Sequence, residues 1–516
     1  MQVLRHLGVL CLMALPNVTP AQNTQEAPLS VIDWLGEKPK VIPKTAVVAK
    51  PGEAPVATSA LPPVVTVTPL GEGSPRAIGL VPPSVTGLPL DIWQGSETVA
   101  IARLLDQLPD LHLPAARSLL YTLLLAEATA PQTAAKQGDL LALARVKALM
   151  EAGALDPALS LIEQAGVATS PDHFALWMQI SLLLGVEDRA CQLLTGKPYL
   201  SSDYGVRILC AARAGKWDNA ALTLGSAQAL QLLPEADLAL LDRFLNPDLF
   251  EGMPPLPVPR KMDPLTFRMF EAIGEPLPTR TLPPAYAVAD LRDIAGWKAQ
   301  LDAAERLTRI GALPDNRFLG IYTDREAAAS GGIWDRVEAL QRFDTALGTR
   351  NVDAISKTLG PAWRAMQEAE LEVNFATLYA EPLQQIALEG GSAALRDRII
   401  LLSPLYESVG LGDAASPEMT FLVTIARGET PGSVPDMPQA AGIASAFTQP
   451  TPRVALINAA QNGQLGASIL NSIALLEEGA RGDTAALRDG LSTLRALGLE
   501  DIARRASLQV LLLERR

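Results

Sequence analysis

Histidine and cysteine are scarce in this chain, with three of each in 516 residues. His112 and His173, the histidines beyond the N-terminal segment, each stand alone in a leucine-rich stretch, which favours structural roles for both. The sequence has no Cys/His spacing typical of a metal site, no Gly-x-Ser-x-Gly elbow and no phosphate-cradling glycine loop. It therefore predicts a protein that is not an enzyme and that needs no metal or cofactor.

Aromatic residues make up only 5% of the chain, and every apolar run beyond the N-terminal segment is broken by charge, glycine or proline. A membrane-spanning helix needs about twenty apolar residues, so we expect no membrane span. Acidic residues outnumber basic ones, and the formal net charge is −13. An acidic surface repels phosphate backbones, which argues against nucleic acid as a partner.

Residues 1–21 have the pattern of a secretory signal peptide. A basic start precedes the apolar stretch 7–15, and small residues at the end predict cleavage after Ala21. The alternative, a lipid-modified Cys11, lacks the small residue that should precede the cysteine. We therefore expect a periplasmic protein.

The segment 22–95 is rich in proline, which fixes φ and removes a hydrogen-bond donor. This composition predicts a disordered arm. Two apolar islands, 29–35 and 78–93, interrupt the arm, and each carries a tryptophan near its end. The first island is equally compatible with docking on a partner and with packing on its own protein. For the second island, packing on its own protein is favoured.

Between residues 153 and 220, a glycine followed by aspartate three residues later and alanine five residues later occurs three times, at intervals of 32 and 30 residues. A turn glycine, a helix-start carboxylate and a small packing residue at this period indicate stacked helix pairs. The copies are Gly153-Asp156-Ala158, Gly185-Asp188-Ala190 and Gly215-Asp218-Ala220. We expect an all-α fold, an α-solenoid of antiparallel helix pairs similar to tetratricopeptide repeats, with the three alanines buried.

Proline-rich stretches divide the predicted solenoid. They indicate a first helical half over 96–250, a joint over 251–284 with one short helix, and a second half over 285–427. The Pro/Gly/Ser-rich stretch 428–453 predicts a loop. A C-terminal cap over 454–516 is expected to hold two helices, separated near residue 480.

Two cysteines remain beyond the signal, Cys191 and Cys210. An even pair in an oxidising compartment suggests a disulfide. Cys191 lies near the start of one predicted helix and Cys210 near the end of the next, so stacking places both at the same edge of the solenoid. We expect the two to be bonded, with two buried free thiols as the alternative.

One loop of the second half is the candidate partner-binding surface. Ser330 with the two glycines after it resembles a helix N-cap, with Asp335 in the first turn. The alternative is an ordinary turn whose tyrosine and tryptophan fill the core. The candidate residues are Tyr322, Arg325, Ser330, Trp334 and Arg336.

A single carboxylate suggests an enzyme as the alternative function. Glu407-Ser408 resembles the Glu-Ser pair of soluble lytic transglycosylases, whose glutamate acts as acid and base on peptidoglycan. The sequence departs from that family downstream, where Gly410-Leu411-Gly412-Asp413 stands in place of a Gly-Leu-Met-Gln segment.

Two stretches, 189–222 and 494–505, resemble a group of exported helical-repeat proteins of alphaproteobacteria. The group has no established activity, so the resemblance implies only the compartment and the helical-repeat fold. Taken together, the sequence favours a periplasmic scaffold that binds an unidentified envelope protein or peptide on the inner face of its helix pairs, without catalysis.

Overall fold

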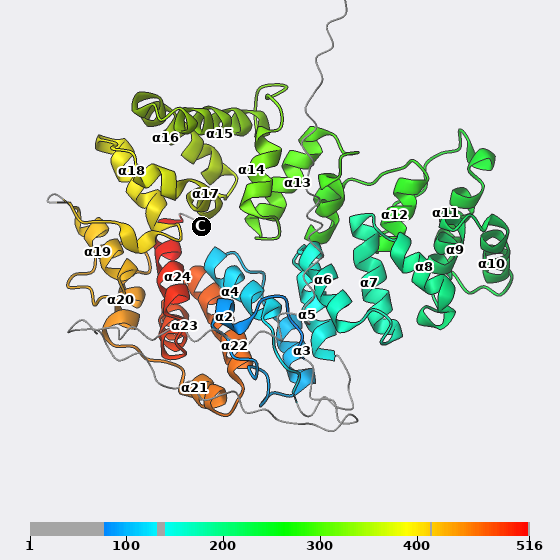
Figure 1. The fold of residues 1–516 in the computed structure, drawn as a ribbon, viewed down its shortest axis with the longest axis horizontal. Helices are drawn as coiled ribbons and strands as arrows, with labels where there is room; N and C mark the ends of the chain where they lie inside the picture. Colours follow the sequence, from blue (N-terminus) through cyan, green and yellow to red (C-terminus); the bar gives the residue numbers. More distant parts are fainter. Residues whose placement is uncertain (1–76, 132–139, 413–414, 514–516) are drawn as a thin grey trace, which may run out of the picture. The chain divides into compact units, whose positions relative to one another are not determined.

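The computed structural model describes residues 77–131, 140–412 and 415–513, which all lie in one compact unit. This part of the chain is built from helices and their connecting segments, as Figure 1 shows, and its β-bridges pair Ile78 with Ala128 and Val81 with Ala126. The predicted all-α, solenoid-like fold is confirmed. None of the described helices combines the length and the apolar character that crossing a membrane requires. The predicted signal peptide and the first apolar island lie outside the described residues.

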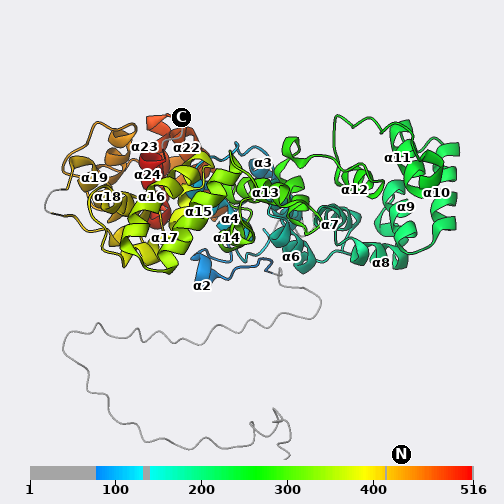
Figure 2. The ribbon, with the colours of Figure 1, turned by 90° about the horizontal axis from the view of Figure 1, so that it is seen from above.

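The period-thirty repeat forms three consecutive helix pairs. They are α5 (Leu140–Glu151) with α6 (Leu155–Ala165), α7 (Pro171–Leu184) with α8 (Asp188–Gly196), and α9 (Tyr204–Arg213) with α10 (Trp217–Ala229). Each pair turns at its repeat glycine, where φ is +79° at Gly153, +77° at Gly185 and +72° at Gly215. Glycine adopts this left-handed conformation without strain, so it ends the first helix of the pair. Figures 1 and 2 both show α6 to α10 following one another in chain order, and α11 (Glu235–Leu245) packs on both α9 and α10.

The repeat alanines lie at helix contacts, as predicted. Ala158, Ala190 and Ala220 are completely buried. A small residue at this position lets the second helix of each pair pack closely against its neighbours. The same turn recurs far along the chain, at Gly498 with Asp501 and the fully buried Ala503. This further copy lies far from the three repeat pairs along the sequence, so it does not continue their fixed period.

The proline-rich segment 251–284 packs on the repeats. Its predicted short helix is α12 (Pro264–Ala272), which contacts α7 and α11. Buried Glu187, at the start of α8, forms ion pairs with Arg213 and with Arg268 of α12, each at 3.1 Å. Short 3-10 segments also occur: η2 (Pro198–Leu200) between α8 and α9, η3 (Pro247–Phe250) after α11, and η4 (Thr279–Thr281) and η5 (Pro284–Leu291) after α12.

Helices continue through the second half of the chain. They are α13 (Trp297–Arg309), α14 (Asp315–Thr323), α15 (Ile333–Gly348), α16 (Val352–Glu368), α17 (Glu372–Gln384), α18 (Gly390–Leu401), the 3-10 turn η6 (Tyr406–Ser408) and α19 (Pro417–Ala426). The predicted loop 428–453 is wrong in part, because it contains α20 (Ala440–Thr448), whose alanine-rich sequence forms a helix despite the surrounding prolines.

The C-terminal cap holds four helices where two were predicted. They are α21 (Val454–Gln461), α22 (Leu465–Ala480), α23 (Thr484–Ala496) and α24 (Glu500–Leu512). Gly463 and Gly498 divide the two expected helices, with φ of +81° and +82°. Apolar residues recur on both sides of each glycine, so periodicity alone did not reveal the turns.

Residues 77–95, which were predicted to belong to the disordered arm, are packed on the protein. This segment contains the short helix α2 (Pro83–Thr86), and its Leu88, Ile92 and Trp93 are buried. Trp93 packs on α22 so closely that a Cβ at Gly466 would lie 2.3 Å from its ring. The second apolar island therefore packs on its own protein, as favoured, and the predicted boundary at residue 95 is wrong.

Helices from the two ends of the described chain pack together. α3 (Thr98–Asp106) contacts α22, and α4 (Pro114–Leu125) contacts α22 and α24, as Figure 1 shows. Side chains of the C-terminal helices cap α4. Glu477 accepts the backbone N–H groups of His112 at 2.9 Å and Leu113 at 3.2 Å, and Gln509 accepts that of Ala115 at 2.7 Å. These are donors that the start of a helix leaves without an internal partner.

Candidate functional site

The first helices of the repeat pairs share a row of three adjoining cavities. One of about 380 Å³ lies among α3, α5 and α7, and one of about 210 Å³ lies among α7, α9 and α12. A third, of about 450 Å³, lies among α9, α11 and α12. Gln179 lines both the first and the second cavity, while Asp203, Asp263 and Leu265 line both the second and the third. We call this row the repeat groove.

The walls of the first two cavities of the repeat groove are largely apolar. Leucines 105, 143 and 176 line the first cavity, and Phe174 and Met178 line the second. In the third cavity, α9 approaches α12 closely, because a Cβ on Gly205 would lie 2.7 Å from Cδ2 of Leu265. The groove therefore offers apolar contacts along several successive helices, as the inner surfaces of helical repeats do.

Carboxylates dominate the charge of the repeat groove. Its cavities are lined by six acidic residues and one basic residue, Lys147. The ammonium of Lys147 lies 2.8 Å from Asp106 and 3.8 Å from Glu151. Its hydrogen bond to Asp106 raises the pKa of Lys147. The other four acids are Asp172, Asp203, Asp237 and Asp263.

The three aspartates of the third cavity lie at the starts of helices. Asp203 accepts the N–H of Val206 at 3.1 Å and so caps α9. Asp263 caps α12 by accepting from the N–H of Thr266 at 3.0 Å and from its hydroxyl at 2.6 Å. Asp237 has no hydrogen bond or ion pair to any described residue. Burial raises its pKa, and the charges of Asp263 and Asp203 raise it further.

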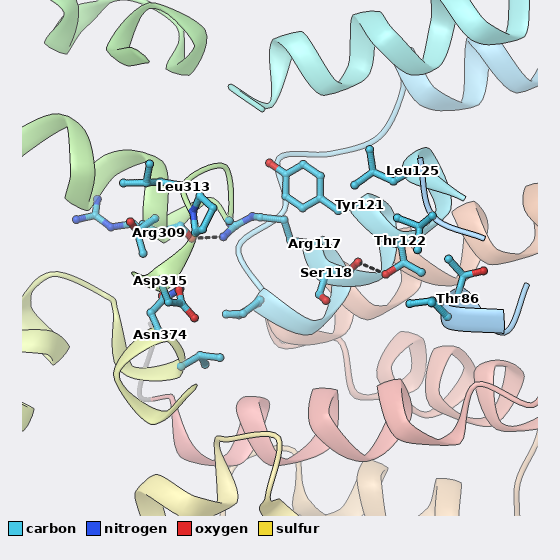
Figure 3. A pocket seen from close by; sticks show the side chains of 17 residues that line it. Thr86, Arg117, Ser118, Tyr121, Thr122, Leu125, Arg309, Leu313, Asp315 and Asn374 are labelled. Atoms are coloured by element: carbon cyan, nitrogen blue, oxygen red, sulfur yellow. Dashed lines mark hydrogen bonds between the residues drawn. The ribbon is translucent and has the colours of Figure 1, made fainter. Parts of the chain in front are cut away.

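A separate cavity of about 460 Å³ lies beside α4, and Figure 3 shows its lining. Arg117 of α4 reaches across it and donates to the main-chain carbonyls of Arg309 and Leu111. The Tyr121 hydroxyl donates to the carbonyl of Ile310 at 3.2 Å. Burial raises the pKa of Tyr121 to about 12, although the charge of Arg117 acts in the opposite direction.

The cavity beside α4 offers little for catalysis. Asn374 donates to Asp315 at 2.7 Å, and burial raises the pKa of Asp315 despite this bond. The lining includes no histidine or cysteine, and Thr122 donates to the backbone of Ser118 within α4. Arg117 and Tyr121 join α4 to the C-terminal end of α13, and the bond between Asn374 and Asp315 joins α17 to α14.

The predicted partner-binding residues do not form one surface. Tyr322 is fully buried and donates its hydroxyl to Glu305, so its placement on a surface is wrong. Arg336 binds the same carboxylate through two nitrogens, each at 2.8 Å. These polar groups pair because a buried carboxylate needs partners.

The remaining candidates lie around the start of α15. Trp334 packs on Trp297, with ring centroids 5.3 Å apart, while Arg325 and Ser330 are exposed. The predicted N-cap at Ser330 is wrong. The cap is Gly332, and the Asp335 carboxylate accepts the N–H of Gly331 at 2.7 Å. The two glycines provide positive φ values that serine would not readily adopt, and this moves the helix start beyond Ser330.

The cysteine prediction is confirmed. Cys191 of α8 and Cys210 of α9 form a disulfide, with their Cα atoms 4.8 Å apart. Both lie at the contact between one helix pair and the next, as the stacking of the pairs implies.

The histidines and the enzyme candidate lie in structural surroundings. His173 is buried beside Ser170, which caps α7, and His112 contacts Glu477 at 2.9 Å. Glu407 is exposed in η6 and contacts Arg504 at 2.6 Å. It lines none of the cavities described above. The deep cleft that a catalytic carboxylate requires is therefore not found at this position.

No known family model, curated protein or solved structure matches the chain. The resemblance to exported helical-repeat proteins therefore stays a prediction. Sequence reasoning did not identify the acidic lining of the repeat groove, although Asp172, Asp203, Asp237 and Asp263 all have the pattern of helix-start residues. Their convergence depends on how the helices stack, which the pattern does not reveal.

Proposed function

We propose that the protein is a helical-repeat scaffold that binds a protein or peptide partner in the repeat groove. The observation that carries the proposal is the row of adjoining cavities along α5, α7, α9 and α11. Helical repeats bind extended or helical segments along surfaces of this kind. The apolar side chains of the groove supply contacts with the partner, and its carboxylates fix how the partner is aligned along the groove.

We also place this activity outside the cytoplasm. Support comes from the Cys191–Cys210 disulfide, because structural disulfides persist mainly in oxidising compartments. The lytic transglycosylase alternative receives no comparable support, since Glu407 is exposed and paired with an arginine.

The proposal is tested by filling the groove. Ala175 is exposed on α7 and lines the second cavity, so Ala175→Trp should block the groove without disturbing the core. Ala221 is an equally exposed helical alanine on α10 that lines none of these cavities, and Ala221→Trp is the matched control. The mature protein and both variants are used as baits on an envelope fraction after chemical cross-linking. We expect discrete partners that the wild type and Ala221→Trp retain and Ala175→Trp loses. Equal retention by all three proteins would exclude the groove as the binding surface.

A further inference from the structure

We infer that the occupant of the repeat groove is a basic peptide segment that combines lysine or arginine with apolar side chains. This inference rests on the proposed function, because it names the class of partner for the same groove. Six carboxylates and one lysine line the row of cavities, and the carboxylates are distributed over all three.

The third cavity has the strongest requirement for a cation. Asp203, Asp237 and Asp263 line it, and none of its other lining residues is basic. Helix capping anchors Asp203 and Asp263, so these two carboxylates cannot separate without losing their caps. A cationic side chain from a partner would relieve their mutual repulsion and that of Asp237, which is the usual role of charge complementarity at an interface.

The apolar walls point to a peptide rather than to a simple cation. Leu240, Leu241 and Met269 surround the aspartates of the third cavity, and Phe174 and Met178 line the second. A peptide that alternates basic and apolar residues pairs with the carboxylates and packs against the apolar side chains. The four helices α5, α7, α9 and α11 lie along the row, and three intervals of about 10 Å between them extend over roughly 30 Å. An extended peptide covers that distance with about nine residues.

Charge also decides between the possible macromolecular occupants. The chain has a formal net charge of −13, so a second copy would bring further acidic surface to an acidic groove. Nucleic acids and anionic lipid surfaces are disfavoured for the same reason. A basic segment of another protein remains the occupant that both the charge and the apolar walls favour.

The inference is tested with three labelled nine-residue peptides in which leucine alternates with lysine, glutamine or glutamate. Binding to the full chain is measured by fluorescence anisotropy at low and high salt. We expect the lysine peptide to bind about tenfold more tightly than the glutamine peptide at low salt, with the difference shrinking at high salt. Spermine is the competitor. If spermine displaces the lysine peptide as effectively as unlabelled peptide does, the apolar walls contribute nothing and the peptide assignment is overturned.

Matched variants separate the groove from the general acidity of the protein. Asp172→Asn with Asp237→Asn removes two carboxylates from the groove, each in the first turn of its helix. Asp218→Asn with Asp353→Asn removes two first-turn carboxylates that line none of these cavities. The loss of helix-dipole stabilisation is therefore similar in the two pairs. We expect the groove pair to weaken the lysine peptide about fivefold and the control pair to leave it nearly unchanged. Equal weakening by both pairs would overturn the inference.

Failure of this inference differs from failure of the proposed function. If the lysine and glutamine peptides bind equally and Ala175→Trp abolishes both, the groove binds peptides but its carboxylates do not select them. If no peptide binds and Ala175→Trp retains every cross-linked partner, both proposals fail. Circular dichroism of each variant confirms that loss of binding does not come from unfolding.

Discussion

Replacing Glu477 should release the N-terminal helices from the C-terminal helices. This completely buried side chain accepts the N–H groups of His112 and Leu113 and also contacts the guanidinium of Arg481 at 3.3 Å. Glu477→Ala removes all these interactions and leaves two amides at the start of α4 without their acceptor. Hydrogen bonds to a charged group contribute roughly 1.5 to 3 kcal/mol each, and the losses are not additive. We therefore expect the local opening free energy to fall by about 3 kcal/mol.

Hydrogen exchange measures this loss at the affected amides. A decrease of about 3 kcal/mol corresponds to exchange at His112 and Leu113 that is on the order of a hundredfold faster. Glu477→Gln keeps one carbonyl acceptor and removes the charge, so its effect should be intermediate. Glu478 is the exposed neighbour on the same helix, and Glu478→Ala should change the exchange rates less than about threefold. Similar acceleration by Glu477→Ala and Glu478→Ala would refute the capping role.

Three further outcomes are expected. A non-reduced digest of protein from its native compartment should contain the Cys191–Cys210 cross-linked peptide, and two alkylated thiols in that digest would contradict the bond. Cys191→Ser should lower the free energy of unfolding by about 3 kcal/mol. Ala220→Glu places a charge at a fully buried position and should lower the thermal midpoint of unfolding by many degrees. Ala221→Glu, on the exposed face of the same helix, should leave the midpoint nearly unchanged. Similar midpoints for the two variants would show that the repeat alanine is not a packing residue. The raised pKa of Asp237 means that the folded protein holds its proton more tightly than the unfolded chain, so stability decreases as pH rises through that pKa. Asp237→Asn should therefore raise the thermal midpoint at neutral pH, and the gain should vanish below the ordinary aspartate pKa; a gain that persists in acid would contradict this.

Together, two of these experiments predict opposite effects of one substitution. Asp237→Asn should stabilise the protein and weaken its binding of a basic peptide. A residue that lowers the stability of the free protein and strengthens its binding to a partner is typical of a functional position. If the substitution changed neither property, Asp237 would be an ordinary solvated carboxylate.

Local features of the fold were readable because they depend on neighbours in the sequence. The turn at Gly185, the buried Ala190 and the bond between Cys191 and Cys210 all follow from one repeated pattern. The sequence-based predictions were wrong where one local pattern is compatible with two structures. The apolar run around Gly463 is compatible with one long helix or with two, and contacts with Trp93 and Gly95 accompany the division.

The sequence alone determined the helical class, the three repeat pairs and the cysteine pairing, since each depends on periodicity and on short spacings along the chain. Only the tertiary structure decided which distant residues meet. Glu477 caps a helix that begins more than 360 residues earlier, and Asp203, Asp237 and Asp263 converge from three segments on one cavity. Such contacts arise from how helices stack, because a carboxylate at a helix start has the same local pattern whether it faces solvent, a cap or a groove.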